Sequence, residues 1–258
     1  MLTDAVPRIR LGNLPTPVEE LPRLARALGL RRLLVKRDDL TGLAGGGNKT
    51  RKLEFSVAEA LRQGADTLVT LGAIQSNHAR QTAAAAARCG LRCSLVLGGQ
   101  PPAAENGNLL LDRLLGAEVV FCGVRPRDEV AARAVAELRE AGHRPYLIPL
   151  GASDEVGAVG FVAALEELRD QCRVGGFLPD RVVVASSSFG TQAGLCLGAA
   201  ALGFRPQIVG ISIDAELREL QAGVARVARR TAARLGLCLL YTSPSPRDMR
   251  RSRMPSSA

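Results

Sequence analysis

Residues 67–89 read TLVTLGAIQSNHARQTAAAAARC, a strand, a polar turn and a helix in that order. The run at 67–71 predicts a buried strand, because β-branched and aliphatic residues favour strands. The small and polar residues at 72–78 predict a turn, and the Ala-rich segment at 77–89 predicts a helix. A strand that passes through such a turn into a helix is the unit from which parallel sheets are built.

The same succession recurs from about residue 31 onward. Strands are expected at 33–36, 67–71, 94–97, 119–122, 146–148, 181–185 and 207–213, and helices at 50–63, 77–89, 106–116, 127–141, 155–172 and 191–202. Strands that are apolar on both faces and alternate with helices predict parallel sheets covered by helices. The expected fold class is therefore α/β.

The composition points to a cytoplasmic protein. The chain has 258 residues, of which 47% are hydrophobic, so it can bury a substantial core. It contains no apolar run of about 18 residues, and its start lacks the pattern of a secretory signal, so no membrane contact is expected. Six cysteines are scattered without paired spacing, which favours buried thiols over a zinc site.

The net charge of +9 raises the alternative of a nucleic-acid partner. Most arginines alternate with Glu and Asp along expected helices, where they indicate solvated faces. Two basic clusters remain, at 226–234 and 247–253, and neither is flanked by the aromatic residues on which single-stranded bases stack. No nucleic-acid partner is expected, although a basic binding protein remains a rival from another functional class.

Lysine is almost absent: the chain has 31 Arg and 3 Lys, and the lysines are Lys36, Lys49 and Lys52. Guanidinium stays protonated and is a poor nucleophile, whereas a lysine amine can lose its proton, attack an aldehyde and hold it as an imine. The clustering of the three lysines therefore predicts Schiff-base chemistry. Three surface lysines that cluster by chance are the alternative.

A second turn has the composition of an anion site. Residues 186–194 read SSSFGTQAG and follow the expected strand at 181–185. Small residues at the start of a helix let the backbone approach an anion, and Ser and Thr add donors, although an ordinary polar turn is an equal alternative. An anion cradle, a reactive amine and a Ser-Asn turn together indicate pyridoxal phosphate as the cofactor.

Several ordered motifs carry a family resemblance: LPTP at 14–17, KRDD at 36–39, GGNKTRKLE at 46–54, QSNHARQ at 75–81, AENGN at 104–108, RPYLIP at 144–149 and GTQAG at 190–194. From Pro7 to about Val224 the chain resembles the D-cysteine desulfhydrase and aminocyclopropane-carboxylate deaminase family. That family belongs to the tryptophan-synthase-β-like, fold-type II pyridoxal-phosphate enzymes. The resemblance implies two open, parallel-rich sheets flanked by helices.

The resemblance also implies roles for individual residues. Lys49 would bind the cofactor aldehyde and move protons at the substrate α-carbon, and Lys52 would face the cofactor phosphate. Ser76 would act beside the reacting carbon, Asn77 would bond the ring 3-hydroxyl, and both would contact substrate together with His78. The phosphate nest would comprise Ser187, Ser188, Phe189, Gly190 and Thr191. The structural alternatives are an N-cap for Asn77 and a simple turn residue for Ser76.

The implied reaction is β-elimination of D-cysteine to pyruvate, hydrogen sulfide and ammonia. His78, followed by Ala79-Arg80-Gln81, resembles the desulfhydrase branch, whereas the deaminase branch carries Gln in place of the histidine. Aminocyclopropane-carboxylate deaminase and L-cysteate sulfo-lyase activities are the alternatives within the family, and an inactive fragment is a further one. The implied partners are a small amino-acid substrate and, in a complete protein, a second copy of the chain.

The sequence departs from the family in two places. Relatives carry glycines where this chain has Ser187 and Phe189, and a Phe is expected there only with negative φ. After Leu237 the pattern stops, and a basic, Ser- and Pro-rich tail at 238–258 predicts disorder and a non-native end. Two domains are expected. The large domain comprises residues 1–49 and 161–237, is incomplete at its C-terminus and should expose apolar surface. The small domain comprises residues 50–160.

Overall fold

The computed structural model describes residues 2–237 and divides them into two compact units. The N-terminal unit comprises Pro7–Ala152. The C-terminal unit comprises the described residues before Pro7 and those from Ser153 onward. The predicted disordered tail at 238–258 lies outside the described residues.

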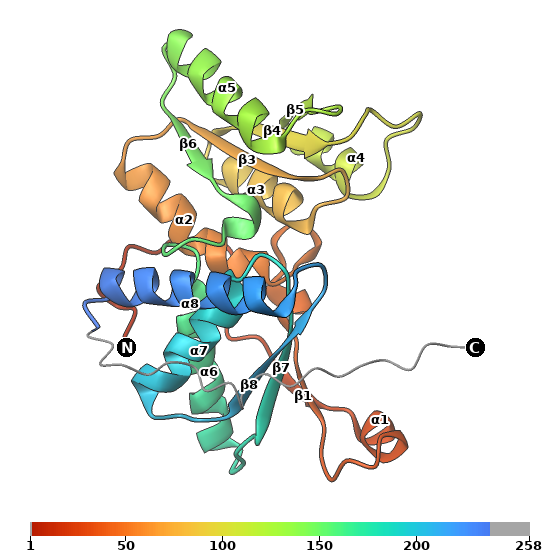
Figure 1. The fold of residues 1–258 in the computed structure, drawn as a ribbon, viewed down its shortest axis with the longest axis vertical. Helices are drawn as coiled ribbons and strands as arrows, with labels where there is room; N and C mark the ends of the chain where they lie inside the picture. The colour runs from red at the N-terminus through yellow and green to blue at the C-terminus, as the bar shows by residue number, and fades with distance from the viewer. Residues whose placement is uncertain (1, 238–258) are drawn as a thin grey trace. The chain divides into compact units, whose positions relative to one another are not determined.

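The N-terminal unit is built around a four-stranded parallel sheet with the strand order β5-β4-β3-β6 (Figure 1). Its elements are β1 (Val18–Glu20), α1 (Pro22–Ala27), β2 (Leu34–Lys36), the 3-10 turns η1 (Asp38–Thr41) and η2 (Leu43–Gly45), α2 (Lys49–Arg62), β3 (Thr67–Ala73), α3 (Asn77–Arg88), β4 (Arg92–Gly98), α4 (Gly107–Leu114), β5 (Glu118–Phe121), α5 (Arg127–Glu140), β6 (Pro145–Ile148) and η3 (Leu150–Ala152). The α/β class predicted from the sequence is confirmed.

Helices cover both faces of this sheet, which explains why its two central strands are mostly apolar. Leu95 and Leu97 of β4 point into the core formed with α2, α3 and α4, whereas Val96 packs with Val130 and Ala131 of α5. Successive side chains of a strand point to opposite faces, so a strand buried on both sides carries apolar residues on both of its faces.

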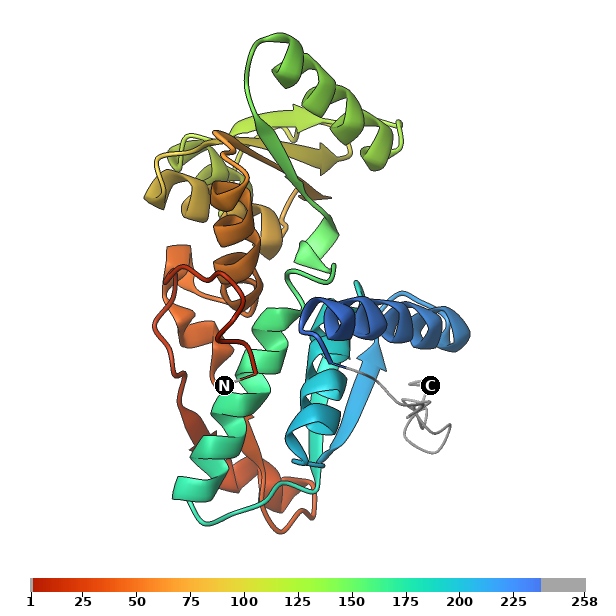
Figure 2. The same cartoon turned by 90° about the vertical axis from the view of Figure 1, so that its left-hand side faces the viewer.

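The C-terminal unit pairs two parallel strands with three helices. Its elements are α6 (Val159–Val174), β7 (Arg181–Ser186), α7 (Gly190–Leu202), β8 (Gln207–Ser212) and α8 (Leu217–Arg234). Figure 2 shows α6 and α7 side by side next to the β7–β8 pair. Phe161 and Leu165 of α6, Leu195 of α7 and Ile208 of β8 form one buried cluster.

Helix α8 was not among the predicted elements. Leu220, Val224 and Val227 recur at helical spacing and are buried against Ala158 and Ala193. The basic cluster predicted at 226–234 lies on this helix, where Arg226, Arg229, Arg230 and Arg234 are not buried and Val227, Thr231 and Ala232 are buried. The arginines are therefore the solvated side of an amphipathic helix.

The β7–β8 pair leaves apolar side chains uncovered. Val183 is 64% exposed, Ile211 40% and Ile213 69%. Exposed apolar surface was expected for the large domain. Cys89, Cys93 and Cys122 are free thiols, Cys93, Cys122 and Cys172 are buried, and Cys238 lies outside the described residues. None of the helices within 2–237 is long and apolar enough to cross a membrane.

The two units do not divide the chain where the expected domains do. Residues 7–49 belong to the same unit as 50–152, not with the second half of the chain. The cause is a set of contacts to α2: the buried Glu54 carboxylate accepts the Leu11 and Gly12 N–H groups at 3.0 and 3.1 Å and pairs with Arg8. These bonds attach the N-terminal segment to the helix that begins at Lys49.

Candidate functional site

Lys49 is the first residue of α2 and follows three glycines in unusual conformations. Gly45, Gly46 and Gly47 have φ values of 85°, 77° and 130°. A Cβ on Gly46 would lie 1.9 Å from the Asp39 carbonyl oxygen. The close approach and the positive φ both require glycine at position 46.

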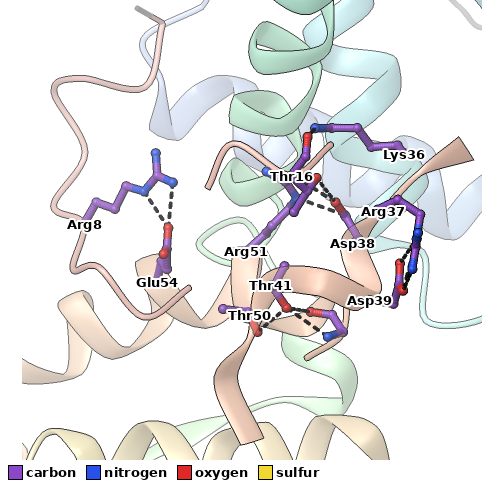
Figure 3. Close-up of polar contacts among 11 residues, drawn as sticks. Arg8, Thr16, Lys36, Arg37, Asp38, Asp39, Thr41, Thr50, Arg51 and Glu54 are labelled. Carbon is purple, nitrogen blue, oxygen red and sulfur yellow. Dashed lines mark hydrogen bonds and ion pairs between the residues drawn. The ribbon is translucent and has the colours of Figure 1, made fainter. Parts of the chain in front are cut away.

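A buried threonine holds the peptide groups that precede Lys49. The Thr41 hydroxyl accepts the Gly47 N–H at 2.9 Å and donates to the Gly47 carbonyl at 2.9 Å (Figure 3). Thr41 Oγ1 also lies 3.2 Å from Thr50 Oγ1, and both threonines are fully buried. The loop is therefore fixed on one side by η1 and by the first turn of α2.

Helix α3 holds the same loop from its other side. The Gly46 carbonyl accepts hydrogen bonds from Gln81 Nε2 at 2.8 Å and Arg80 Nη2 at 2.7 Å. Thr50 donates to Gln81 Oε1 at 2.7 Å. Gln81 is completely buried, so these bonds are shielded from water and join the starts of α2 and α3.

The other polar side chains near the start of α2 are also engaged. Arg51 is 2% exposed and forms an ion pair with Asp38, with Nη2 2.8 Å from Oδ1, and also bonds Thr16 (Figure 3). Lys52 is completely buried and donates to the Gly151 carbonyl at 3.0 Å. These contacts fix the orientation of the helix about its own axis.

Lys49 differs from its neighbours because its amine makes no hydrogen bond or ion pair with any residue between 2 and 237. The side chain is partly buried, and this burial lowers the pKa of the Lys49 amine. A lowered pKa increases the fraction of neutral amine, which is the nucleophilic form. The structure thus places an amine with a lowered pKa after a loop that is held by hydrogen bonds on both sides.

The turn before α3 carries the next set of predicted residues. Ser76 is the N-cap of α3, and its hydroxyl accepts the Ala79 N–H at 3.2 Å. Asn77 is the first helical residue, and its exposed side chain accepts from Asn108 Nδ2 at 3.0 Å. Asn108 also donates to the Gln75 carbonyl at 2.7 Å. The N-cap of α3 is therefore Ser76, and the alternative that Asn77 caps this helix is wrong.

Asn108 was not predicted as a site residue. It lies on α4, within the AENGN motif, and it receives a bond from Arg80 Nη1 at 3.1 Å. The motif was visible in the sequence, but its contact with a turn about 30 residues away was not.

His78 faces the interior of the unit, away from the exposed Asn77. Its ring is 3% exposed, and Nε2 lies 2.8 Å from Thr70 Oγ1 on β3. Burial and the nearby charges of Lys49 and Lys52 lower the pKa of His78 to about 3. The imidazole is therefore neutral at ordinary pH, and its ring is not presented at the protein surface.

The predicted phosphate nest lies in the C-terminal unit, at the start of the 13-residue helix α7. Phe189 has φ 68° and ψ −38°, and the Gly190 N–H bonds the Ser188 carbonyl at 2.8 Å. This is a γ-turn of the strained type, centred on Phe189. The expectation of negative φ at Phe189 is therefore wrong.

The aromatic ring of Phe189 explains how the strain is tolerated. The ring packs with Leu220, Val224 and the rest of the α8 cluster. A Cβ on Gly223 would lie 2.6 Å from the ring. Helix α8 thus has a glycine at the position that the ring covers, and the packing offsets the cost of the turn.

The serines of this loop are bound within the C-terminal unit. The Ser187 hydroxyl donates to Asp214 Oδ2 at 2.8 Å, so its proton does not point toward an anion. Ser188 Oγ lies 2.8 Å from Ser153 Oγ. The buried Ser186 Oγ and Gln192 Oε1 have no hydrogen-bond partner within the described part of the chain. The donors best suited to an anion are the backbone N–H groups that begin α7, next to Thr191.

Each of these groups, taken by itself, suits one part of pyridoxal phosphate. The unpaired amine of Lys49 suits an aldehyde, and the backbone donors that begin α7 suit a phosphate. Lys49, Lys52, Ser76, Asn77 and His78 lie in the N-terminal unit, and residues 187–191 lie in the C-terminal unit.

Comparisons with known proteins agree on one family. The family model for "Pyridoxal-phosphate dependent enzyme" matches residues 9–238. A D-cysteine desulfhydrase of Klebsiella pneumoniae (strain 342) is 44% identical over 241 residues, covering 90% of this chain and 72% of the relative. The D-cysteine desulfhydrase of Yersinia enterocolitica (serotype O:8 / biotype 1B) is 44% identical over 237 residues, covering 90% and 71%.

Solved structures give the same result. A crystal structure of an "ACC deaminase homologue" superposes with a TM-score of 0.85 at 37% identity, covering 93% of this chain and 73% of that one. The crystal structure of a threonine deaminase from T.th. has a TM-score of 0.62 at 28% identity, covering 78% and 60%.

Proposed function

Because the chain belongs to the pyridoxal-phosphate-dependent enzymes, we propose that it catalyses β-elimination of D-cysteine to pyruvate, hydrogen sulfide and ammonia. The observation that carries the proposal is the unpaired amine of Lys49 at the end of a loop that Thr41, Gln81 and Arg80 hold in place. The desulfhydrase names of the relatives at 44% identity support the choice of substrate.

Lys49 would bind the cofactor and move the substrate α-proton. When bound, pyridoxal phosphate supplies an aldehyde and an electron sink that acidifies the α-proton. The burial that lowers the pKa of Lys49 helps its amine to act as a general base on that proton. Lys52 would supply positive charge toward the cofactor phosphate, and its amine also donates to the Gly151 carbonyl at 3.0 Å.

The start of α3 would bind the substrate carboxylate. Ser76 caps the helix, and the helix dipole favours an anion there. His78 would contribute its backbone N–H rather than its ring, because the ring is directed to Thr70. Asn77, whose side chain is exposed, would bond the ring hydroxyl of the cofactor.

The cofactor phosphate would be bound at the start of α7. Gly190 and Thr191 would offer backbone N–H groups, and the γ-turn at Phe189 would hold Ser187 and Ser188 beside them. The Ser187 hydroxyl would have to leave Asp214 before it could donate to a phosphate.

A homodimer and a cytoplasmic location complete the proposal. The free thiols of Cys89, Cys93 and Cys122 agree with a reducing compartment. The likeness to the "ACC deaminase homologue" supports a second candidate activity, the deamination of aminocyclopropane-carboxylate. Side-by-side assays of pyruvate release from D-cysteine, L-cysteate and aminocyclopropane-carboxylate would separate these activities.

The test combines labelling with turnover. Pyridoxal phosphate followed by borohydride should modify Lys49, and peptide mapping should locate the label there. Lys49→Ala should lose the label and sulfide release, whereas Lys36→Arg should keep both, because Lys36 bonds the Thr16 carbonyl, away from this chemistry. A label at Lys36 or Lys52 alone, or no sulfide from D-cysteine, would overturn the proposal.

A further inference from the structure

A network of amide groups joins the turn before α3 to the start of α4. The Gln75 side chain accepts the Asn108 backbone N–H at 2.8 Å and donates to the Asn106 carbonyl at 3.2 Å. Asn106 is the N-cap residue of α4, but its side chain does not cap the helix, so Gln75 satisfies a free N–H group of the first turn instead. The network thus fixes the first turn of α4 against the turn that carries Asn77.

The partners of the Asn108 side chain determine which end of its amide is the oxygen. Arg80 Nη1 lies 3.1 Å from one end, and a guanidinium only donates, so that end is Oδ1. The Gln75 carbonyl oxygen lies 2.7 Å from the other end, and a carbonyl only accepts, so that end is Nδ2. A donor and an acceptor thus lead to the same assignment, and neither of them is Asn77.

The orientation of Asn108 in turn fixes the amide of Asn77. The Asn77 side chain lies 3.0 Å from Asn108 Nδ2, which is a donor, so Asn77 must present its Oδ1 there. Asn77 Nδ2 is the other end of the amide, and it has no hydrogen-bond partner among residues 2–237. The side chain is exposed, so a ligand can reach it. The free end of Asn77 is therefore a donor.

We propose that Asn108 is a positioning residue that holds the Asn77 amide with its NH2 end free, so that Asn77 binds an oxyanion of the ligand. The identity of that oxyanion as the ionised ring hydroxyl of the cofactor rests on the proposed function, whereas the orientation of the amide does not. A donor bonded to an oxyanion favours the charged form, and such bonds are stronger than neutral ones. Arg80 acts through Asn108 and also bonds the Gly46 carbonyl, so one guanidinium holds both the loop before Lys49 and the amide pair.

The orientation is tested without cofactor, by NMR measurement of hydrogen exchange at the Asn108 side-chain amide in the full chain. Asn77→Ala removes an acceptor and should speed this exchange by about tenfold. Asn77→Asp should keep the exchange slow, because a carboxylate still accepts from Asn108 Nδ2. If Asn77→Asp sped the exchange as much as Asn77→Ala, Asn77 would be the donor of the pair and the inference would be overturned. Unchanged exchange in Asn77→Ala would also overturn it.

The consequence for the ligand is tested with Asn108→Asp, which keeps the shape of the side chain. A carboxylate only accepts, so the Asn77 amide should turn its NH2 end to position 108 and its oxygen to the ligand. With pyridoxal phosphate bound, the absorbance bands of the ionised and the protonated ring hydroxyl are followed against pH. The midpoint of this titration should rise by about one pH unit or more in Asn108→Asp.

Two comparisons separate this effect from the added charge. Asn106→Asp adds the same charge at the start of α4 and keeps an acceptor for Gln75 Nε2, so its midpoint should equal that of the wild type. In an Asn77→Ala background, Asn108→Asp should shift the midpoint no further, because the amide through which it acts is gone.

An unchanged midpoint in Asn108→Asp, or an equal shift in Asn106→Asp or in the Asn77→Ala background, would overturn the role of Asn108. The exchange measurement leaves Asn108 in place, so it decides the orientation even where Asn108→Asp fails to fold. A chain that bound no pyridoxal phosphate would refute the proposed function, but the exchange measurement would still decide how the Asn77 amide is held. The two failures are therefore distinguishable.

Discussion

Acidification should destabilise the N-terminal unit through His78. In the folded protein the pKa of His78 is about 3, against an ordinary value of 6.5. Between these values the unfolded chain binds a proton that the folded chain excludes, so stability is full above the ordinary pKa and falls as the pH falls toward 3. From about pH 7.5 to about pH 4.5 the loss amounts to about 2–3 kcal/mol, because each pH unit between the two pKa values contributes roughly 1.4 kcal/mol.

Asp112 opposes this effect, so the wild-type pH profile alone cannot reveal it. The Asp112 carboxyl is fully buried, and neither oxygen has a hydrogen-bond partner among residues 2–237. Burial raises its pKa to about 7, although Arg80 and Arg113 act in the other direction. The folded state therefore takes up this proton before the unfolded state does, and stability rises as the pH falls below about 7.

Urea unfolding followed by circular dichroism, at both pH values, would isolate the two groups. The stability of the wild type relative to His78→Leu should fall by about 2–3 kcal/mol on acidification. Its stability relative to Asp112→Asn should change in the opposite direction. If the stability difference between the wild type and His78→Leu did not depend on pH, the inference that His78 is buried and neutral would be refuted.

Two further predictions concern the loops of the two units. Gly223→Ala should cost about 1–3 kcal/mol of stability, because the new methyl group meets the Phe189 ring. In a Phe189→Ala background the same change should be neutral or stabilising, as expected for Ala in a helix. Equal costs in both backgrounds would exclude this contact. Thr41→Val should lower the free energy of unfolding by about 1–3 kcal/mol and speed hydrogen exchange at the Gly47 amide, because it removes both bonds to Gly47. Thr41→Ser should largely restore the stability and the slow exchange. An exchange rate like that of the wild type in the valine variant would contradict the proposed anchoring.

The parallel sheet of the N-terminal unit was predictable because its signal is local. Residues 94–97 are mostly apolar, and such a run can be buried only between two layers of helix. Helix α8 was not predicted, although its apolar residues have helical spacing, because its arginines were interpreted only as a basic cluster. The short β1 and α1 were missed because three and six residues carry little periodic signal.

The backbone conformation of Phe189 could not be predicted from the neighbouring residues. The local rule against positive φ for a bulky residue was sound, but the ring is held against Gly223, a residue far along the chain. The same limit applied to Asn108, whose partners lie in the turn at Gln75–Asn77. In both cases the stabilising contact comes from another element, so no local pattern contains it.

The sequence by itself determined the α/β class, the family motifs and the choice of Lys49, because periodicity and residue type are properties of neighbouring positions. Only the tertiary structure decided that Lys49 has no partner within residues 2–237, that the His78 ring is buried beside Thr70, and that Phe189 is held in a strained turn. Each of these facts depends on which groups from distant parts of the chain come within hydrogen-bonding or van der Waals distance. Such distances are set by packing and not by composition.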